Sequence, residues 1–245
     1  KLAKAEDDVK IIIYDDKMPR ILTTPRYTAY VKVAEGCDNR CAYCVIPLVR
    51  GNFRSRTIES IVAETKNLVK NGVKEINLIA QDTTNYGIDL YGEIKILELL
   101  KELVKIEELK WIRLLYCYPK RFTDELLNFM ATEPKICKYI DLPLQHAHND
   151  VLKAMARQDT KEEIEDLLLR IRKIMPTATI RTSFIVGFPG ESIEHYETLK
   201  EFIIKQRFDK VGIFTYSKEE DTVAFTMEQQ VSEEIKQERY HELMA

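Results

Sequence analysis

Long hydrophobic runs are missing from this sequence, because no apolar stretch approaches the roughly eighteen residues that a membrane-spanning helix needs. No signal peptide is visible either. We therefore expect a cytoplasmic protein with no membrane partner. An excess of one charge is also missing, since 37 Lys and Arg stand against 40 Asp and Glu, a formal net charge of -3. This balance excludes a global electrostatic footprint for nucleic acid, although not a local basic patch.

Cysteine is scarce, with five residues in 245. An odd set of thiols in a chain of this length argues against a disulfide framework and for a reducing compartment, where clustered cysteines bind metal or catalyse. Cys37, Cys41 and Cys44 lie within eight residues in the spacing CxxxCxxC, and no fourth cysteine follows nearby. A structural zinc site normally takes four ligands. Three clustered thiols therefore predict an open metal site with room for a substrate.

The composition, 45% hydrophobic and 31% charged, is that of a globular protein, and no internal repeat or low-complexity tract is present. Hydrophobic periodicity predicts six strands, each followed by helix. The predicted strands are 30–33, 75–80, 111–118, 139–144, 179–186 and 211–216, and the helices are 58–70, 94–108, 123–132, 149–157, 161–175, 192–206 and 232–244.

Strands alternating with helices indicate an α/β fold with parallel strands and right-handed crossovers. Six units are too few for a complete eight-fold barrel, which leaves an open doubly wound sheet or a partial (β/α)6 TIM-like barrel. We expect residues 1–27 to be a linker or inter-domain segment, 28–230 the core, and 231–245 a C-terminal helix. The chain starts at Lys1 and not at Met, so we expect a fragment of a longer protein.

Polar and metal-capable residues follow each predicted strand, where both folds place their active sites. They are Cys37, 81–84, 117–119, Gln145 with His146, 187–191, and Tyr216 with Ser217. Thiolates suit zinc, copper or iron–sulfur clusters. His146 could complete a Cys3His zinc site, which would make the chain a zinc-stabilised, non-catalytic binding module. Alternatively, three cysteines hold three irons of a 4Fe-4S cubane and leave the fourth iron open.

The CxxxCxxC run with Tyr43 before its last cysteine resembles the radical S-adenosylmethionine superfamily. The resemblance implies a 4Fe-4S cluster whose open iron chelates S-adenosylmethionine, and a reduced cluster that cleaves it to methionine and a 5′-deoxyadenosyl radical. The usual core of this superfamily is a six-unit partial barrel. Cluster potentials are tuned by charge, hydrogen bonds and solvent exposure.

Further runs resemble the methylthiotransferases, which insert sulfur and a methyl group at an unactivated C–H. These runs are 30–37, 50–51, 54–56, 142–146, 155–157 and 184–191. One branch modifies an adenosine in transfer RNA and the other the β-carbon of an aspartate in a small-subunit ribosomal protein. Runs 80–84, 86–87, 89–92, 114–119 and 214–217 resemble the ribosomal branch. The transfer-RNA branch usually has an asparagine-containing run after strand two and aspartate in place of Ser183.

The resemblance implies roles for individual residues. Cys37, Cys41 and Cys44 would be metal ligands; Tyr43, Gln145, Arg157 and Ser183 would bind cofactor; and Asp82, Thr83 and Arg50 would face substrate. The alternatives are a barrel-mouth hydrogen bond for Gln145, a surface position for Arg157 and Arg50, core packing for Ser183, and helix capping or solvation at the rim for Asp82 and Thr83.

The resemblance also implies parts that this sequence does not contain. Family members carry an N-terminal domain whose three further cysteines hold a second 4Fe-4S cluster, and a C-terminal β-barrel of the TRAM type. We expect an electron donor of the flavodoxin or ferredoxin class and a small-subunit ribosomal protein as partners. The second cluster takes part in sulfur insertion, so an isolated core would bind S-adenosylmethionine without completing the reaction.

Overall fold

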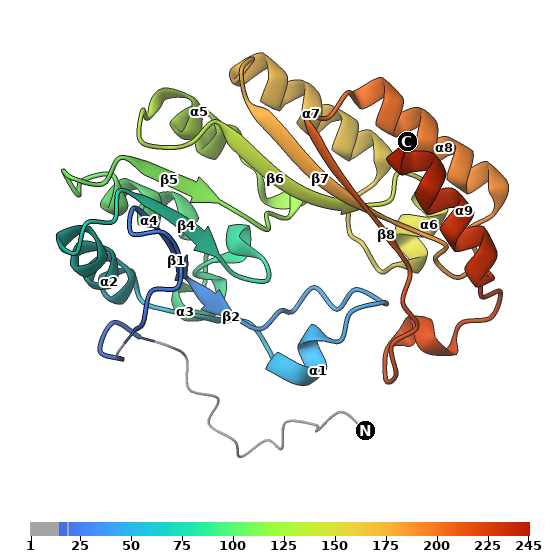
Figure 1. Cartoon of the computed structure of the whole chain (residues 1–245), viewed down its shortest axis with the longest axis horizontal. Helices are drawn as coiled ribbons and strands as arrows, with labels where there is room; N and C mark the ends of the chain where they lie inside the picture. Colours follow the sequence, from blue (N-terminus) through green and yellow to red (C-terminus); the bar gives the residue numbers. More distant parts are fainter. Residues whose placement is uncertain (1–14, 19) are drawn as a thin grey trace.

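The structure, a computed structural model, describes residues 15–18 and 20–245. Six parallel strands form its wall (Figure 1). One sheet has the order β1 (Thr28–Lys32), β4 (Glu75–Ile79) and β5 (Trp111–Leu114), and the other β6 (Tyr139–Gln145), β7 (Thr179–Val186) and β8 (Lys210–Thr215). A parallel bridge between Ile112 and Ile136 joins the two sheets.

The spatial order of these six strands follows their order in the chain, with no reversal. A doubly wound sheet requires a reversal and helices on both faces. Here the long helices lie along the outer side of the curved wall (Figure 1). The partial (β/α)6 barrel is therefore confirmed, and the doubly wound alternative is not.

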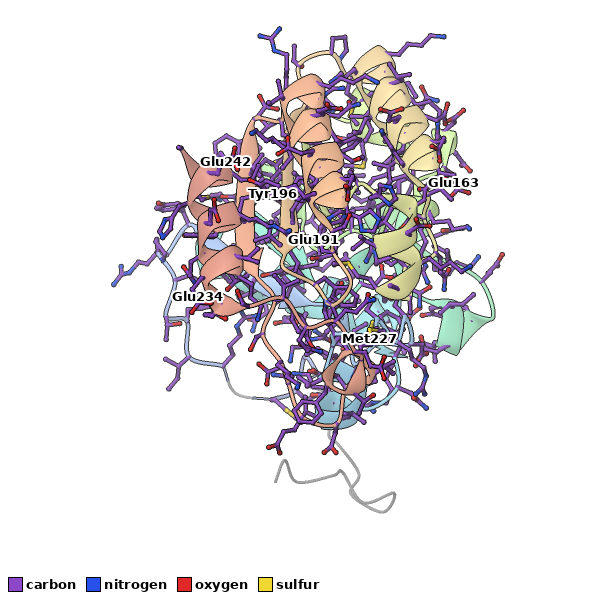
Figure 2. The ribbon with its side chains drawn as sticks, turned by 90° about the vertical axis from the view of Figure 1, so that its right-hand side faces the viewer. Glu163, Glu191, Tyr196, Met227, Glu234 and Glu242 are labelled. Carbon is purple, nitrogen blue, oxygen red and sulfur yellow. The ribbon has the colours of Figure 1, made fainter. Side chains whose placement is uncertain are left out.

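The long helices begin at side-chain caps, which satisfy backbone N–H groups that have no partner within the helix. Thr57, Thr123 and Ser232 cap α2 (Ile58–Lys70), α5 (Asp124–Thr132) and α9 (Glu233–Met244). Thr160 and Ser192 form capping boxes at α7 (Lys161–Ile174) and α8 (Ile193–Gln206). Figure 2 looks onto the side where Tyr196 and Glu242 meet between α8 and α9, with a hydrogen bond of 2.6 Å.

Alternation along each strand separates the core from the barrel interior. On β7, Ile180, Thr182, Phe184 and Val186 are buried, whereas the residues between them are more accessible. Since successive strand side chains point to opposite faces, one face packs under the helices and the other lines the interior. We therefore expect the functional side chains on the interior face of the strands.

Several short elements were not expected from the sequence. The strands β2 (Ala34–Glu35) and β3 (Arg54–Ser55) form an antiparallel pair, and the helices α1 (Ile46–Arg50) and α3 (Ile88–Tyr91) are short. A two-residue strand shows no periodicity. The helix expected at 94–108 is shorter, α4 (Ile96–Leu103), while α6 (Asn149–Ala154) ends at Ala154.

The third strand was expected to reach residue 118 but ends at Leu114. Tyr116 adopts a left-handed φ of 58°, which no strand can continue. Its backbone N–H is taken up by the Asp141 carboxylate at 2.9 Å. At this point the Asp141 side chain of the next strand therefore takes the place of a backbone acceptor in the sheet.

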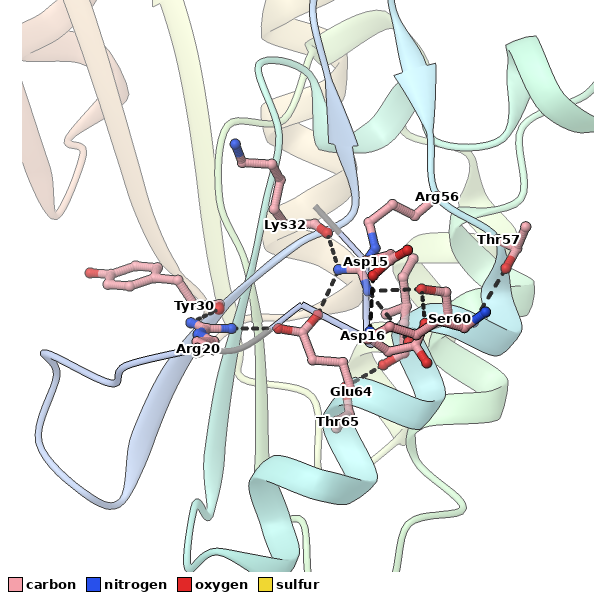
Figure 3. A network of polar contacts seen from close by, with 12 residues as sticks. Asp15, Asp16, Arg20, Tyr30, Lys32, Arg56, Thr57, Ser60, Glu64 and Thr65 are labelled. Carbon is pink, nitrogen blue, oxygen red and sulfur yellow. Dashed lines mark hydrogen bonds and ion pairs between the residues drawn. The ribbon is translucent and has the colours of Figure 1, made fainter. Parts of the chain in front are cut away.

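The expected linker at 1–27 lies partly outside the described residues, and its described part contacts the core. Arg20 forms an ion pair with Glu64 of α2 at 2.5 Å, and Asp16 accepts a hydrogen bond from Ser60 (Figure 3). Glu64 also pairs with the buried Arg56 at 2.6 Å. Arg20 is thus held against α2 by a carboxylate that it shares with Arg56.

Candidate active site

A cavity of about 690 Å³ opens at the carboxyl ends of the strands. The cavity is lined by all three clustered cysteines and by six of the seven other residues that were predicted to bind cofactor or substrate. These nominated residues are Cys37, Cys41, Cys44, Tyr43, Gln145, Arg157, Ser183, Asp82 and Arg50. Side chains more than a hundred residues apart in the sequence therefore meet at one site.

The cysteine loop, residues 37–44, follows β2 and begins after Gly36, where no residue with a side chain fits. Gly36 has φ +80°, and a Cβ there would lie 2.1 Å from the Asn52 carbonyl oxygen. This close approach allows the Cys37 N–H to donate to Gly51 at 3.2 Å. The short antiparallel pair β2–β3 thus closes the base of the loop.

The middle of the cysteine loop is tied to the second half of the barrel. The Ala42 N–H donates to Met155 at 2.9 Å, and the Ala42 carbonyl accepts from Ala224 at 2.8 Å. Ala42 is buried in a small apolar cluster with Phe188 and Tyr216. Hydrogen bonds from both halves of the barrel therefore hold the cysteine loop.

The three thiols of the cysteine loop are not gathered around a single ion. All five cysteines are free, and among the described residues the cysteines form no set with every ligand atom within 4.8 Å of the others. Thiolates around one tetrahedral zinc would be about 3.8 Å apart. Burial raises the pKa of Cys37 to about 11 and also raises the pKa of Cys44.

Cys117 also lines the cavity but does not extend the thiol set. Its side chain is buried, and burial raises its pKa well above the ordinary value. The charged groups that act on it are Asp141 and Asp82, not the other thiols. The candidate metal ligands among the described residues therefore stay Cys37, Cys41 and Cys44.

Asp82 is a buried anchor for the cysteine loop. Its carboxylate lies 3.0 Å from the Arg121 guanidinium and accepts from Asn39 at 2.8 Å and from Thr84 at 2.8 Å. Arg121 also donates to Asn39 and to Asn85 at 3.0 and 2.8 Å. Asp82 is only 1% exposed. Its geometry fits a structural clamp on Asn39, within the loop, more closely than a substrate contact.

Arg157 lines the cavity and makes contacts that need the planar guanidinium of arginine. Its guanidinium stacks 4.1 Å from the centroid of the Tyr118 ring and donates to the Pro143 carbonyl at 3.2 Å. Asp159 pairs with it at 3.3 Å. A planar cation held against an aromatic face cannot be replaced by lysine without loss of both contacts. The surface position considered for Arg157 is therefore wrong.

Three further nominated residues line the same wall. Gln145 ends β6 at a register shift with a left-handed φ of 74°, a backbone conformation that carries strain and is frequent at functional sites. Ser183 lies on the interior face of β7. Tyr43 packs edge-on against Phe188 at 6.5 Å, and burial raises its pKa well above the ordinary value, so the phenol stays neutral.

Two charged groupings at the cavity were not found from the sequence. Lys32 and Arg50 both pair with the carboxylate of Glu35, at 2.5 and 2.8 Å. Arg181 on β7 pairs with Asp141 on β6 at 2.6 Å. One carboxylate between two cations leaves a positive charge on the Lys32–Arg50 wall. Alternation along β7 places Arg181 on the inward face together with Ser183, but the pairing of Arg181 with Asp141 leaves no signal in the sequence.

Two nominated residues lie elsewhere. Thr83 is fully buried, and its hydroxyl donates to the Leu115 carbonyl at 2.5 Å, so it does not line the cavity. His146 is also fully buried and lies 3.3 Å from Glu191, whose carboxylate also accepts from Arg239. His146 therefore does not complete a zinc site with the cysteines, and its burial lowers its pKa.

Comparison with known proteins agrees with this geometry. Residues 31–203 match the family model described as the radical SAM superfamily. The chain is 60% identical over 234 residues to "Ribosomal protein uS12 methylthiotransferase RimO" of Desulforamulus reducens, which covers 96% of this chain and 53% of that protein. The protein of the same name in Desulfitobacterium hafniense is 52% identical over 244 residues, with coverages of 100% and 55%. The chain spans about half the length of these relatives.

Solved structures share the fold. Coproporphyrinogen III oxidase (HemN) from Escherichia coli superimposes with a TM-score of 0.67 at 16% identity, over 89% of this chain and 52% of that one. The radical S-adenosylmethionine methyltransferase TsrM from Kitasatospora setae gives 0.62 at 18% identity, over 77% and 36%. Fold, cysteine loop and family match agree: the chain belongs to the radical SAM superfamily.

Proposed function

We propose that this chain is the radical-generating core of a methylthiotransferase that acts on the β-carbon of an aspartate in ribosomal protein uS12. The observation that carries the proposal is the cysteine loop at the cavity mouth, in a chain 52–60% identical to relatives that bear this name. Cys37, Cys41 and Cys44 would hold a 4Fe-4S cluster, which supplies the electron that cleaves S-adenosylmethionine.

The remaining cavity residues divide between cofactor and substrate. Tyr43, Gln145, Arg157 and Ser183 would bind and orient S-adenosylmethionine, with Arg157 fixed by its stack on Tyr118. The positive wall of Lys32 and Arg50 lies where a substrate carboxylate would be attracted. A charge-assisted contact of this kind favours aspartate over an uncharged target.

A transfer-RNA adenosine is the second candidate substrate, and no particular residue contact favours it over aspartate. The zinc-stabilised binding module is less well supported, because the thiols are not arranged around one ion and His146 lies away from them. A second cluster in a further domain, a flavodoxin or ferredoxin as electron donor, and a cytoplasmic location complete the proposal. Of the helices in residues 15–18 and 20–245, none is long and apolar enough to cross a membrane.

Anaerobic reconstitution with iron and sulfide tests the core. We expect about four irons per chain and release of 5′-deoxyadenosine from S-adenosylmethionine when reductant is added. Replacement of Cys37, Cys41 and Cys44 by Ala should abolish both, whereas Cys137→Ala, a thiol away from the cavity, should leave both unchanged. Full iron content in the triple variant would contradict the site.

The substrate is tested with the full-length parent protein. Mass spectrometry after turnover should find a methylthio group on an aspartate of uS12 and none on adenosine of transfer RNA. The reverse result would assign the chain to the other branch. One zinc and no sulfide in anaerobically purified protein, with no 5′-deoxyadenosine formed, would support the binding module instead.

A further inference from the structure

A second group of metal-capable side chains lies where α6 and α8 begin, outside the cavity. His148 is the N-cap of α6, Asp150 lies in its first turn, and His195 is the third residue of α8. One ligand atom from each of the three side chains lies within 4.8 Å of the other two. This is the single set of that kind among the described residues.

We propose that His148, Asp150 and His195 bind a divalent transition-metal ion of the zinc class. Asp150 Oδ2 lies 3.9 Å from His148 Nδ1 and 4.0 Å from His195 Nε2. Donor atoms around a four-coordinate zinc are about 3.3 Å apart. Each carboxylate–imidazole separation must therefore close by roughly 0.7 Å. His148 Nδ1 must also release the Asp150 backbone N–H, from which it accepts a hydrogen bond of 3.2 Å as the N-cap of α6.

The donors select the kind of ion. Two imidazoles with one carboxylate suit zinc, nickel or copper, whereas magnesium and calcium require a shell of oxygen ligands. The imidazoles are already side by side, with ring centroids 4.2 Å apart, and both side chains are about three-quarters buried. Little side-chain entropy therefore remains to be lost when they bind a common ion.

The surroundings provide a partner for the second nitrogen of His195. Its Nδ1 lies 3.2 Å from the Gly190 carbonyl oxygen. A metal-bound histidine commonly donates its other ring N–H to a carbonyl. Zinc at Nε2 therefore requires the tautomer in which Nδ1 donates to Gly190, and the hydrogen bond that Nδ1 accepts from the Ser192 N–H at 3.2 Å in the capping box is then given up. The Nε2 atom of His195 is the one that faces Asp150.

An ion at this point would connect two parts of the active-site wall. The C-terminal end of α6 supplies the Met155 carbonyl that accepts from Ala42 in the cysteine loop, and α8 follows the turn at Gly187–Glu191. A ligand that binds the folded state alone stabilises it in proportion to the logarithm of its concentration. Zinc should therefore raise the melting temperature of the chain, whether or not the chain carries a cluster.

The test uses variants that remove an imidazole but preserve the helix cap. His148→Asn keeps a strong N-cap, and His195→Gln keeps a capping-box residue at the third position of α8. Both are made in a chain with Cys37, Cys41 and Cys44 replaced by Ala, so that zinc cannot bind the cysteine loop. His241→Gln, on the exposed face of α9, is the matched control.

Calorimetric titration with zinc chloride should give one ion per chain in the parent background and in the control. Each imidazole variant should bind at least about tenfold more weakly, and the double variant should lose the rise in melting temperature. Equal zinc affinity in the double variant, or no zinc bound by the parent background, would overturn the proposal. If circular dichroism shows that the cysteine background is unfolded, nickel titration of the cluster-reconstituted chain applies the same criteria.

Discussion

Replacing Asp82 by Ala should strongly destabilise the fold, because it removes the carboxylate that holds the cysteine loop. The carboxylate is almost completely buried and contacts Arg121, Asn39 and Thr84, all within 3.0 Å. Removing one partner of a buried ion pair costs about 3 to 5 kcal/mol, since the other charge stays buried without compensation. The Arg121 side chain is 18% exposed, so we expect a value near the lower end.

The measurement is urea unfolding of the full chain, followed by circular dichroism. The matched control is Glu125→Ala, which breaks an exposed pair with Lys101. An exposed pair contributes about 0 to 1 kcal/mol, so the control should unfold close to the parent. For a chain of this size, about 3 kcal/mol corresponds to a fall in melting temperature of roughly 6 to 12 °C.

The same variant separates two interpretations of Asp82. A substrate-facing carboxylate would alter turnover of the parent protein and leave the free energy of unfolding unchanged. A structural clamp would lower stability and also the iron retained after reconstitution, because Asn39 loses its partner. If Asp82→Ala unfolds within 1 kcal/mol of the Glu125→Ala control, the clamp is refuted.

Three further predictions follow from single contacts. Burial lowers the pKa of His146 from 6.5, so the unfolded chain binds a proton that the folded ring resists. The unfolding free energy should then fall as pH drops below 6.5, by up to about 1.4 kcal/mol per unit from this group. His146→Gln should reduce this slope, to which His148 also contributes because burial lowers its pKa too; an unchanged slope would contradict the role of His146. Gly187→Ala should cost about 2 to 4 kcal/mol in urea unfolding, because φ is +74° and the new Cβ would lie 2.3 Å from Lys236 Cγ, whereas Gly72→Ala, with open space, should cost about 1 kcal/mol. Arg157→Lys should weaken S-adenosylmethionine binding about tenfold in calorimetry with iron content unchanged, since lysine cannot stack and fork as arginine does; equal affinity would show that charge alone suffices.

The strands and helices could be predicted because their signals are local. Periodicity marks which face of an element is buried, and caps such as Thr57 and Thr160 mark where helices begin. Parallel strands then place all of their carboxyl ends at the same rim of the barrel. That rule predicted that the cysteine loop and Gln145 meet at one cavity, whereas Ser183, inside β7, was predicted from the family resemblance.

The partners within the site could not be predicted, because ion pairs between distant residues leave no periodic trace. Asp82 was nominated for substrate, yet Arg121, which lies 39 positions further along, occupies its carboxylate. Thr83 is adjacent to Asp82, but its side chain points toward Leu115 and away from the cavity. A motif thus identifies a segment, whereas the direction of each side chain depends on what packs against it.

The geometry of the thiols depends on both halves of the barrel. Asn39 is held by Asp82 and Arg121, which follow strands of the first sheet, while Ala42 bonds to Met155 and Ala224 in the second half. A loop fixed from both sides can hold its three thiols in one arrangement, whereas a free loop of eight residues would lose conformational entropy on doing so. The spacing CxxxCxxC therefore provides the candidate ligands, but the arrangement of the two sheets in the partial barrel provides the site.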